Sequence, residues 1–340
     1  MKGAPRAGRW AGALCVLSLL LLASLAIGLM VGSSAIAPGA VWDALFGDGT
    51  AVTTDIVLRV RLPRVILGAL VGASLATAGV LFQALLRNPL ADPYILGVSG
   101  GAALGGISVL ALGGALGLGY AAVPPASFAG AVATLVLLFA VAGPRGHLSP
   151  TTLLLTGVVF NSFASAAIVF LASTAGLTDG ARIFLWLIGN LSDARSEVSI
   201  WVAVFLGLGL ACALPLARGL NLLALGEEPA EQLGLDVEWT KRLLLLATSL
   251  MVGAAVSAAG LVGFVGLIVP HLLRLVLGPD HRLLVPAAAL GGAAFLVLSD
   301  TAARTVLGGR ELPVGAITAL LGGPLFLLLL RRQPGVGARS

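Results

Sequence analysis

Charged residues are scarce in this chain. Only 10% of its 340 residues are Asp, Glu, Lys or Arg, whereas 58% are hydrophobic and the mean hydropathy is +1.06. Soluble domains carry about 25% charged residues. The scarcity of charged residues excludes an ordinary soluble domain and indicates an integral membrane protein.

Several kinds of chemical site are also missing from the sequence. The two cysteines, Cys15 and Cys212, lie far apart in apolar stretches, a spacing that holds no metal and is typical of small core residues. No GxxxxGK[ST] phosphate loop, HExxH motif or paired carboxylates within an apolar stretch occurs. His147, His271 and His281 fall near the ends of apolar stretches and are interpreted as packing residues. We therefore expect no enzyme, no cofactor and no metal site.

Long uncharged runs dominate what is present. Crossing a bilayer takes about 20 mostly apolar residues. The runs predict an all-α polytopic membrane protein that forms one transmembrane domain over residues 1–340. The ten expected spans are about 11–31, 64–86, 94–112, 121–143, 151–172, 198–217, 243–261, 263–277, 283–303 and 313–331. The first run resembles a signal peptide but exceeds the usual length of its apolar core, so we interpret it as a retained span.

The distribution of bases predicts the orientation. With the N-terminus inside and ten spans, both termini are cytoplasmic and most Lys and Arg residues lie on the inner side, as expected for a plasma membrane protein of a bacterium. The bases are scattered through loops, so the net charge of +5 favours a lipid partner and not nucleic acid. The bases placed outside are Arg59, Arg61, Arg64, Arg182, Arg195, Arg304 and Arg310.

An internal repeat is visible in two of the spans. VGASLATAG at 71–79 and VGAAVSAAG at 252–260 begin and end alike and fall five spans apart. An odd separation places the two copies in opposite directions across the membrane. Inverted repeats of this kind are typical of transporters with alternating access. Chance similarity between two helices rich in Gly and Ala is the alternative.

The polar segment, residues 219–242, interrupts the apolar pattern. Its charged residues are Glu227, Glu228, Glu231, Asp236, Glu238, Lys241 and Arg242. Gly226, Pro229 and Gly234 predict that two short helices form here in place of one long helix. The segment is either a solvated loop with a charged face or a docking element for a soluble partner.

Asp300 raises a different possibility. An acid within a span can serve as a proton relay, which would suit a secondary transporter driven by an ion gradient. Arg304 lies one helical turn further on, so a simple ion pair is the competing interpretation. A membrane-embedded enzyme is disfavoured because no catalytic constellation is present.

Four motifs, in order along the chain, carry a resemblance to a known family. They are RLPRVILGALVGASLATAGVLFQALLRNPLADPYILGVSGGAALG, LALGEEPAEQLGL, GLVGFVGLIVPHLLRLVLGPDHR and ELPVGAITALLGGPLFLLLL. Together they resemble FecCD-type permeases, the membrane subunits of ATP-driven importers for iron–siderophores, haem and vitamin B12. The similarity covers about residues 10–331 and does not identify the ligand.

The resemblance implies an assembly. Two copies of the chain would form a homodimer whose pathway is lined largely by the fifth and tenth spans. A dimer of separate ABC ATPase subunits would bind from the cytoplasm, and an extracytoplasmic substrate-binding protein would deliver the ligand. Coupling helices at about 219–238 would contact the ATPase through Leu223, Ala224, Leu225, Gly226, Glu227, Ala230, Gln232, Leu233 and Gly234.

The resemblance also implies roles at the two membrane faces. Arg61, Arg64 and Arg304 match positions that dock the binding protein, and guanidinium groups suit carboxylate recognition. Ordinary interfacial snorkelling is the alternative for each arginine. Asn88, Leu90, Pro150 and Thr151 match a cytoplasmic gate. Pro150 stands where a vitamin B12-type permease has a hydroxyl residue, which puts a polar contact there in doubt.

Overall fold

The computed structural model describes residues 6–32, 34, 36–47, 49–142, 148–307 and 310–332, and every regular element in these ranges is a helix. Eight helices of this described part are long and apolar enough to cross a membrane. They are α1 (Arg6–Met30), α4 (Leu62–Leu85), α5 (Val98–Leu116), α6 (Val123–Ala142), α7 (Pro150–Thr174), α9 (Ser196–Leu223), α11 (Val237–Ala259) and α13 (His281–Thr305). Two further apolar helices, α12 (Val265–Leu277) and α14 (Val314–Arg332), occupy the remaining predicted spans. The all-α polytopic fold is confirmed, although the 13 residues of α12 rise only about 20 Å.

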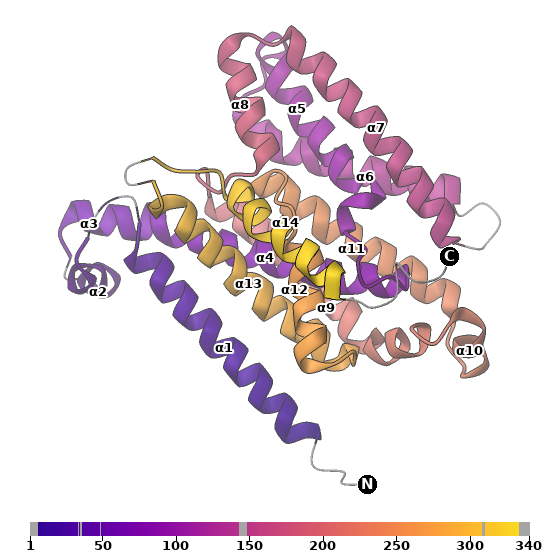
Figure 1. The fold of residues 1–340 in the computed structure, drawn as a ribbon. Helices are drawn as coiled ribbons and strands as arrows, with labels where there is room; N and C mark the ends of the chain where they lie inside the picture. The colour runs from indigo at the N-terminus through magenta and orange to yellow at the C-terminus, as the bar shows by residue number, and fades with distance from the viewer. Residues whose placement is uncertain are drawn as a thin grey trace.

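Helix α4 lies at the centre of the bundle and packs against α9, α11, α12 and α13 (Figure 1). Small residues allow this close packing. A Cβ added at Gly72 would collide with the carbonyl of Gly292 in α13, and one at Gly79 would collide with the carbonyl of Gly266 in α12. Glycine at a helix interface lets backbones touch where lipid supplies no hydrophobic driving force. The small residues of α4 therefore make it the buried axis of the protein.

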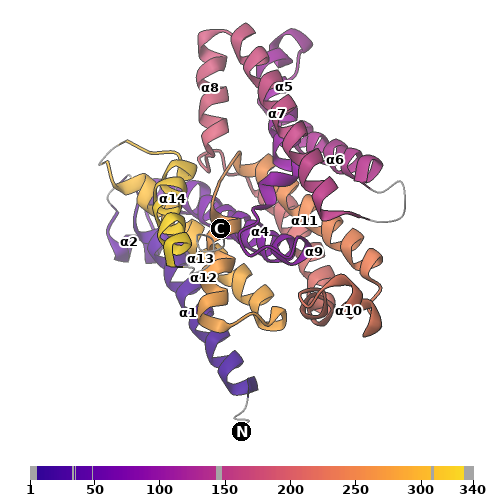
Figure 2. The ribbon, with the colours of Figure 1, turned by 45° about the vertical axis from the view of Figure 1, so that its right-hand side comes forward.

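Helices α5 to α8 group together at one end in both ribbon views (Figure 2), where α8 spans Leu177–Ile188. α5 and α6 also pack through glycine, because a Cβ at Gly101 or at Gly130 would each meet a carbonyl oxygen of the other helix. α1 lies elsewhere, along α13, and most of its surface faces outward. The interior is thus shared between two glycine-packed groups of helices.

Two of the segments that separate the predicted spans contain helices. The stretch before α4 forms α2 (Pro38–Phe46), α3 (Ala51–Asp55) and a π-helical turn, η1 (Ile56–Arg61), that runs directly into α4. Pro63 in the first turn of α4 lacks an N–H and crowds the preceding turn, which accounts for the wider winding of η1. Helix α8 occupies about half of residues 173–197, which lie between the fifth and sixth predicted spans.

Irregular backbone within the bundle is satisfied by internal hydrogen bonds. The 3₁₀ turns are η2 (Pro93–Leu96) and η3 (Tyr120–Ala122). The Tyr94 hydroxyl of η2 donates to the carbonyl of Val262 at 3.0 Å and accepts from the N–H of Val262 at 3.1 Å. Non-helical backbone is tolerated at membrane depth only where protein surrounds it in this way.

The two similar sequence segments lie in α4 and at the end of α11, and these helices pack against each other. Both segments are almost wholly buried. Their inverted relation across the membrane stays a prediction.

Candidate functional site

The polar segment forms the end of α9, the short helix α10 (Glu227–Gln232) and the start of α11. Gly226, with a φ of 124°, and Gly234, with a φ of 84°, interrupt the helices where we predicted breaks. The expectation of two short helices is wrong for the first of them. Residues 219–223 continue the membrane-spanning helix α9, which ends at Leu223, and only α10 is a separate short helix in this segment.

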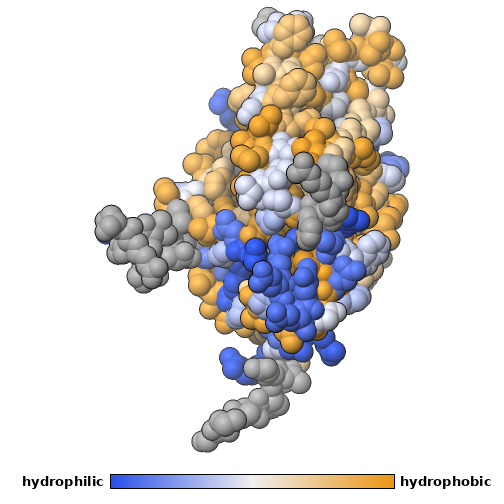
Figure 3. Space-filling view, turned by 90° about the vertical axis from the view of Figure 1, so that its right-hand side faces the viewer, coloured by the Kyte–Doolittle hydropathy of each residue, from blue (hydrophilic) through white to orange (hydrophobic). Residues whose placement is uncertain are grey.

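The polar segment is buried against the bundle at some positions and exposed at others. Leu223, Ala230 and Val237 are buried at 0–2% exposure. Leu225 and Leu233, in contrast, are 65% and 61% exposed. Viewed from the side that carries α10, a hydrophilic patch with scattered hydrophobic atoms lies below a broad hydrophobic surface (Figure 3). The polar segment therefore exposes apolar side chains within a charged surface.

One member of this surface was not predicted. Trp239 in the first turn of α11 is 58% exposed and lies close in sequence to the exposed acids Glu231 and Asp236. Its backbone N–H donates to the Asp236 carboxylate at 2.9 Å, which caps α11. An aromatic residue inside an acidic segment is the sequence signal that could have identified it, because Trp is enriched at binding surfaces.

The four predicted gate residues lie in two separate turns. Asn88 is exposed after α4, and its side-chain oxygen accepts from the N–H of Leu90 at 2.9 Å. Pro150 and Thr151 begin α7, where proline suits the first helical turn because its missing N–H needs no partner there. Their role as a gate stays a prediction.

At the opposite end of α4, Arg61 is only 3% exposed. Its guanidinium donates to the carbonyls of Leu29 at 2.8 Å, Met30 at 3.0 Å and Ser34 at 2.5 Å. The bonds to Leu29 and Met30 satisfy carbonyls at the end of α1 that have no partner within the helix. Arg61 therefore joins the end of α1 to η1.

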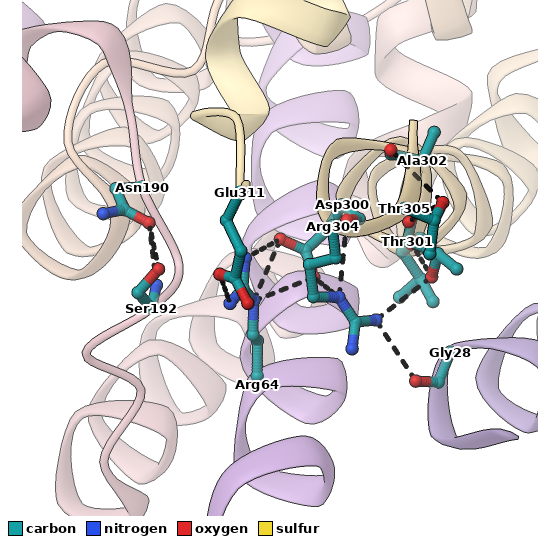
Figure 4. A network of polar contacts seen from close by, with 11 residues as sticks. Gly28, Arg64, Asn190, Ser192, Asp300, Thr301, Ala302, Arg304, Thr305 and Glu311 are labelled. Atoms are coloured by element: carbon teal, nitrogen blue, oxygen red, sulfur yellow. Dashed lines mark hydrogen bonds and ion pairs between the residues drawn. The ribbon is translucent and has the colours of Figure 1, made fainter. Parts of the chain in front are cut away.

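Arg64 and Arg304 converge on one buried acid (Figure 4). Arg64 donates to both carboxylate oxygens of Asp300 at 2.9–3.1 Å and to Glu311 at 2.7 Å. The Nε of Arg304 lies 3.0 Å from Asp300, and its Nη2 donates to the carbonyl of Gly28 at 3.1 Å. The predicted ion pair between Asp300 and Arg304 is confirmed. Because Asp300 also pairs with Arg64, the proton-relay interpretation loses its support.

The three arginines of the predicted docking rim are thus turned into the protein. Arg61, Arg64 and Arg304 are 3–5% exposed, whereas a partner's carboxylate requires a guanidinium that it can reach. Glu311 is the accessible member of the cluster, with a side chain that is 36% exposed. The docking role of the arginines stays a prediction, and it requires that these internal contacts exchange for external ones.

A family comparison now bears on this geometry. The model of the FecCD transport family matches residues 19–332, which is most of the chain. The chain belongs to this family. The match includes both the polar segment and the arginine cluster, so the resemblance found in the four motifs is confirmed.

Named relatives of this FecCD-family chain are permeases. The cobalamin import system permease protein BtuC of Halobacterium salinarum is 48% identical over 287 residues, covering 83% of this chain and 75% of the relative. The hemin transport system permease protein HmuU of Yersinia pestis is 40% identical, covering 93% and 94%. A solved structure described as an inward-facing conformation of a metal-chelate type ABC transporter superposes with a TM-score of 0.82 at 30% identity, covering 95% of this chain and all of that one.

Proposed function

We propose that this chain is the membrane-spanning permease subunit of an ATP-binding-cassette importer for an iron–siderophore, haem or cobalamin-type ligand. Family membership and the named relatives support the general function. The observation that carries the proposal is the surface of the polar segment, where Leu225, Leu233 and Trp239 are exposed among acids at one end of an apolar bundle. Such a mixture of apolar anchors and a charged rim suits a soluble protein partner.

The partner that fits this surface is a separate ATPase dimer in the cytoplasm. The sequence has no phosphate loop, so the nucleotide would be hydrolysed on another chain. Coupling would involve the predicted residues from Leu223 to Gly234, with α10 as the element that moves. Closure of the ATPase dimer would displace α10 and switch the pathway between its outward and inward openings.

A second copy of the chain completes the pathway in this proposal. Val159 and Phe163 on α7 are 69% and 62% exposed, and Leu320 on α14 is 70% exposed. These helices are the fifth and tenth predicted spans, and their apolar faces suit a smooth lining with few polar contacts for the ligand. Each chain would act as one membrane domain, with lipid covering the outward surface of α1.

The proposal places the protein in a bacterial inner membrane with both termini in the cytoplasm. An extracytoplasmic binding protein would dock at the opposite end, near Arg61, Arg64 and Arg304. Since recognition of the ligand would rest mainly with that binding protein, the permease alone does not determine which chelate is carried.

Reconstitution tests the function directly. The chain is placed in proteoliposomes with its candidate ATPase and binding protein, and uptake of cyanocobalamin, hemin and a ferric siderophore is measured with and without ATP. We expect uptake of one of them only when ATP, ATPase and binding protein are all present. Uptake by the permease alone, driven by an ion gradient, would refute the proposal.

A further inference from the structure

Lys241 is a buried lysine for which the predicted site has no role. It lies in the second turn of α11 and is 1% exposed. Its Nζ donates to Glu227 at 2.5 Å, to Glu238 at 3.1 Å and to the carbonyl of Leu148 at 3.2 Å. An ammonium group has three N–H donors, and these three acceptors match that number. A buried charge is stable only when paired and hydrogen-bonded in this manner.

The three acceptors come from three different parts of the chain. Glu227 is the first residue of α10, Glu238 lies in the first turn of α11, and Leu148 precedes α7. The second oxygen of Glu238 accepts from the N–H of Leu148 at 2.9 Å. Glu238 therefore holds the backbone N–H of Leu148, and Lys241 holds its carbonyl. Leu148 lies two residues before Pro150.

Glu227 also contacts the turn that holds the other two predicted gate residues, Asn88 and Leu90. The second oxygen of Glu227 lies 3.7 Å from Nη2 of Arg87, the residue that directly precedes Asn88. Arg87 has a φ of 50°, a left-handed conformation that is uncommon for a residue with a side chain. Its side chain is 42% exposed, so this ion pair is weaker than the buried one at Lys241.

These five residues, Arg87, Leu148, Glu227, Glu238 and Lys241, form what we call the α10 junction. Its two cations and two carboxylates balance, so the cluster is neutral as a unit. Helix α10 has only six residues, which is too short to be stable alone, so its position depends on such contacts. The junction is the polar part of that attachment, and Ala230 is the buried apolar part.

We propose that Lys241 is a positioning residue for transport: it fixes Glu227 of α10 to the start of α7, while the same Glu227 pairs with Arg87 in the turn after α4, so that a displacement of α10 moves both turns together. The inference rests on the proposed function, because it takes α10 as the ATPase contact and the two turns as the gate. In this arrangement the exposed face of α10 receives the motion and the buried face passes it on. Glu227 belongs to the junction, while Glu231 on the same helix is exposed to the partner.

Two carboxylates on the one helix allow a matched test. Glu227→Gln keeps an oxygen acceptor but removes the charge that faces Lys241 and Arg87, whereas Glu231→Gln makes the same chemical change outside the junction. Both variants are reconstituted with the ATPase and binding protein, and ATP hydrolysis and uptake of cyanocobalamin or hemin, whichever the unaltered complex transports, are measured together.

We expect Glu227→Gln to retain ATPase association and hydrolysis while uptake per ATP falls about tenfold, within the usual range of coupling between sites. Glu231→Gln alters the face of α10 that is exposed to the ATPase, so it should act only through ATPase association and leave the uptake per ATP hydrolysed unchanged. Lys241→Met should uncouple more strongly, because it removes the cation that contacts both Glu227 and Glu238 and so leaves two like charges close together. Lys241→Arg keeps the cation and should recover part of the lost uptake per ATP. Arg218→Met, which removes an exposed cation from α9, is the control for Lys241→Met.

The outcomes separate this inference from the proposed function. Equal uptake per ATP in the Glu227→Gln and Glu231→Gln variants would overturn the role of the junction while ATP-driven uptake by the unaltered complex still stood. Loss of ATPase binding in Glu227→Gln would also overturn it, since the junction would then serve docking and not transmission. Absence of ATP-driven uptake in the unaltered complex would instead refute the proposed function.

Discussion

Replacing Asp300 with asparagine should destabilise the protein strongly. The Asp300 side chain is 3% exposed and accepts hydrogen bonds from Arg64, while Arg304 completes the ion-paired cluster. Asparagine has nearly the same size, so the change removes the charge and leaves two buried guanidinium groups with less compensation. Breaking a buried ion pair by removing one partner costs about 3–5 kcal/mol.

A surface ion pair in the same chain provides the control. Arg59 and Asp55 lie 3.1 Å apart, with side chains that are 81% and 61% exposed. Asp55→Asn should therefore cost less than about 1 kcal/mol. Thermal unfolding of both variants in the same detergent, followed by size-exclusion chromatography after heating, gives the comparison.

A double variant sharpens the reasoning. If unpaired charge causes the loss, Asp300→Asn combined with Arg304→Met should be more stable than Asp300→Asn alone, because one uncompensated cation is gone. Equal melting temperatures for the Asp300→Asn and Asp55→Asn variants would show that the buried cluster contributes no more than a surface pair, and the reasoning would fail.

Three other predictions concern the polar segment and the bundle. Leu225→Asp with Leu233→Asp should greatly reduce co-purification of the ATPase while the permease remains folded; undiminished co-purification would argue against the docking surface. Gly79→Leu should lower the melting temperature sharply, because a side chain there meets a carbonyl oxygen of α12, whereas Gly114→Leu has open space and should change little. Hydrogen bonds from the guanidinium of Arg282 hold the pKa of Asp280 below its ordinary value. The contribution of Asp280 to folding stability is therefore fully present above the unfolded pKa of about 3.9 and is lost as pH falls through the lower folded pKa. Asp280→Asn should remove this part of the acid sensitivity, as measured by melting temperature against pH.

The sequence was sufficient to locate the spans because hydropathy is a local property. Runs such as 65–86 and 151–172 lack charge, and the bilayer thickness sets how long each must be. Hydropathy did not distinguish α4 from α1, since both are apolar, yet 83% of an apolar window within the span that includes α4 is buried, against 11% for the span of α1. Burial depends on which helices pack together, and that is set by contacts between distant residues.

The same limit applied to the charged residues. Arg64 was predicted to lie on an outer docking rim from the order of the spans and the family resemblance, but its partners Asp300 and Glu311 lie 236 and 247 residues away. Lys241 looked like one more base in a polar segment, although it contacts Leu148, 93 residues earlier. The breaks at Gly226 and Gly234 were predictable, because glycine favours left-handed backbone at the residue itself.

The glycine contacts of α4 have a mechanical consequence. Where Gly72 and Gly79 bring its backbone against α13 and α12, no flexible side chain lies between the helices to absorb a sliding movement. A pull on the end of α4 next to Arg87 would therefore move α4, α12 and α13 together. The far end of α4, where Arg64 joins it to α13, would move with them on the other side of the membrane.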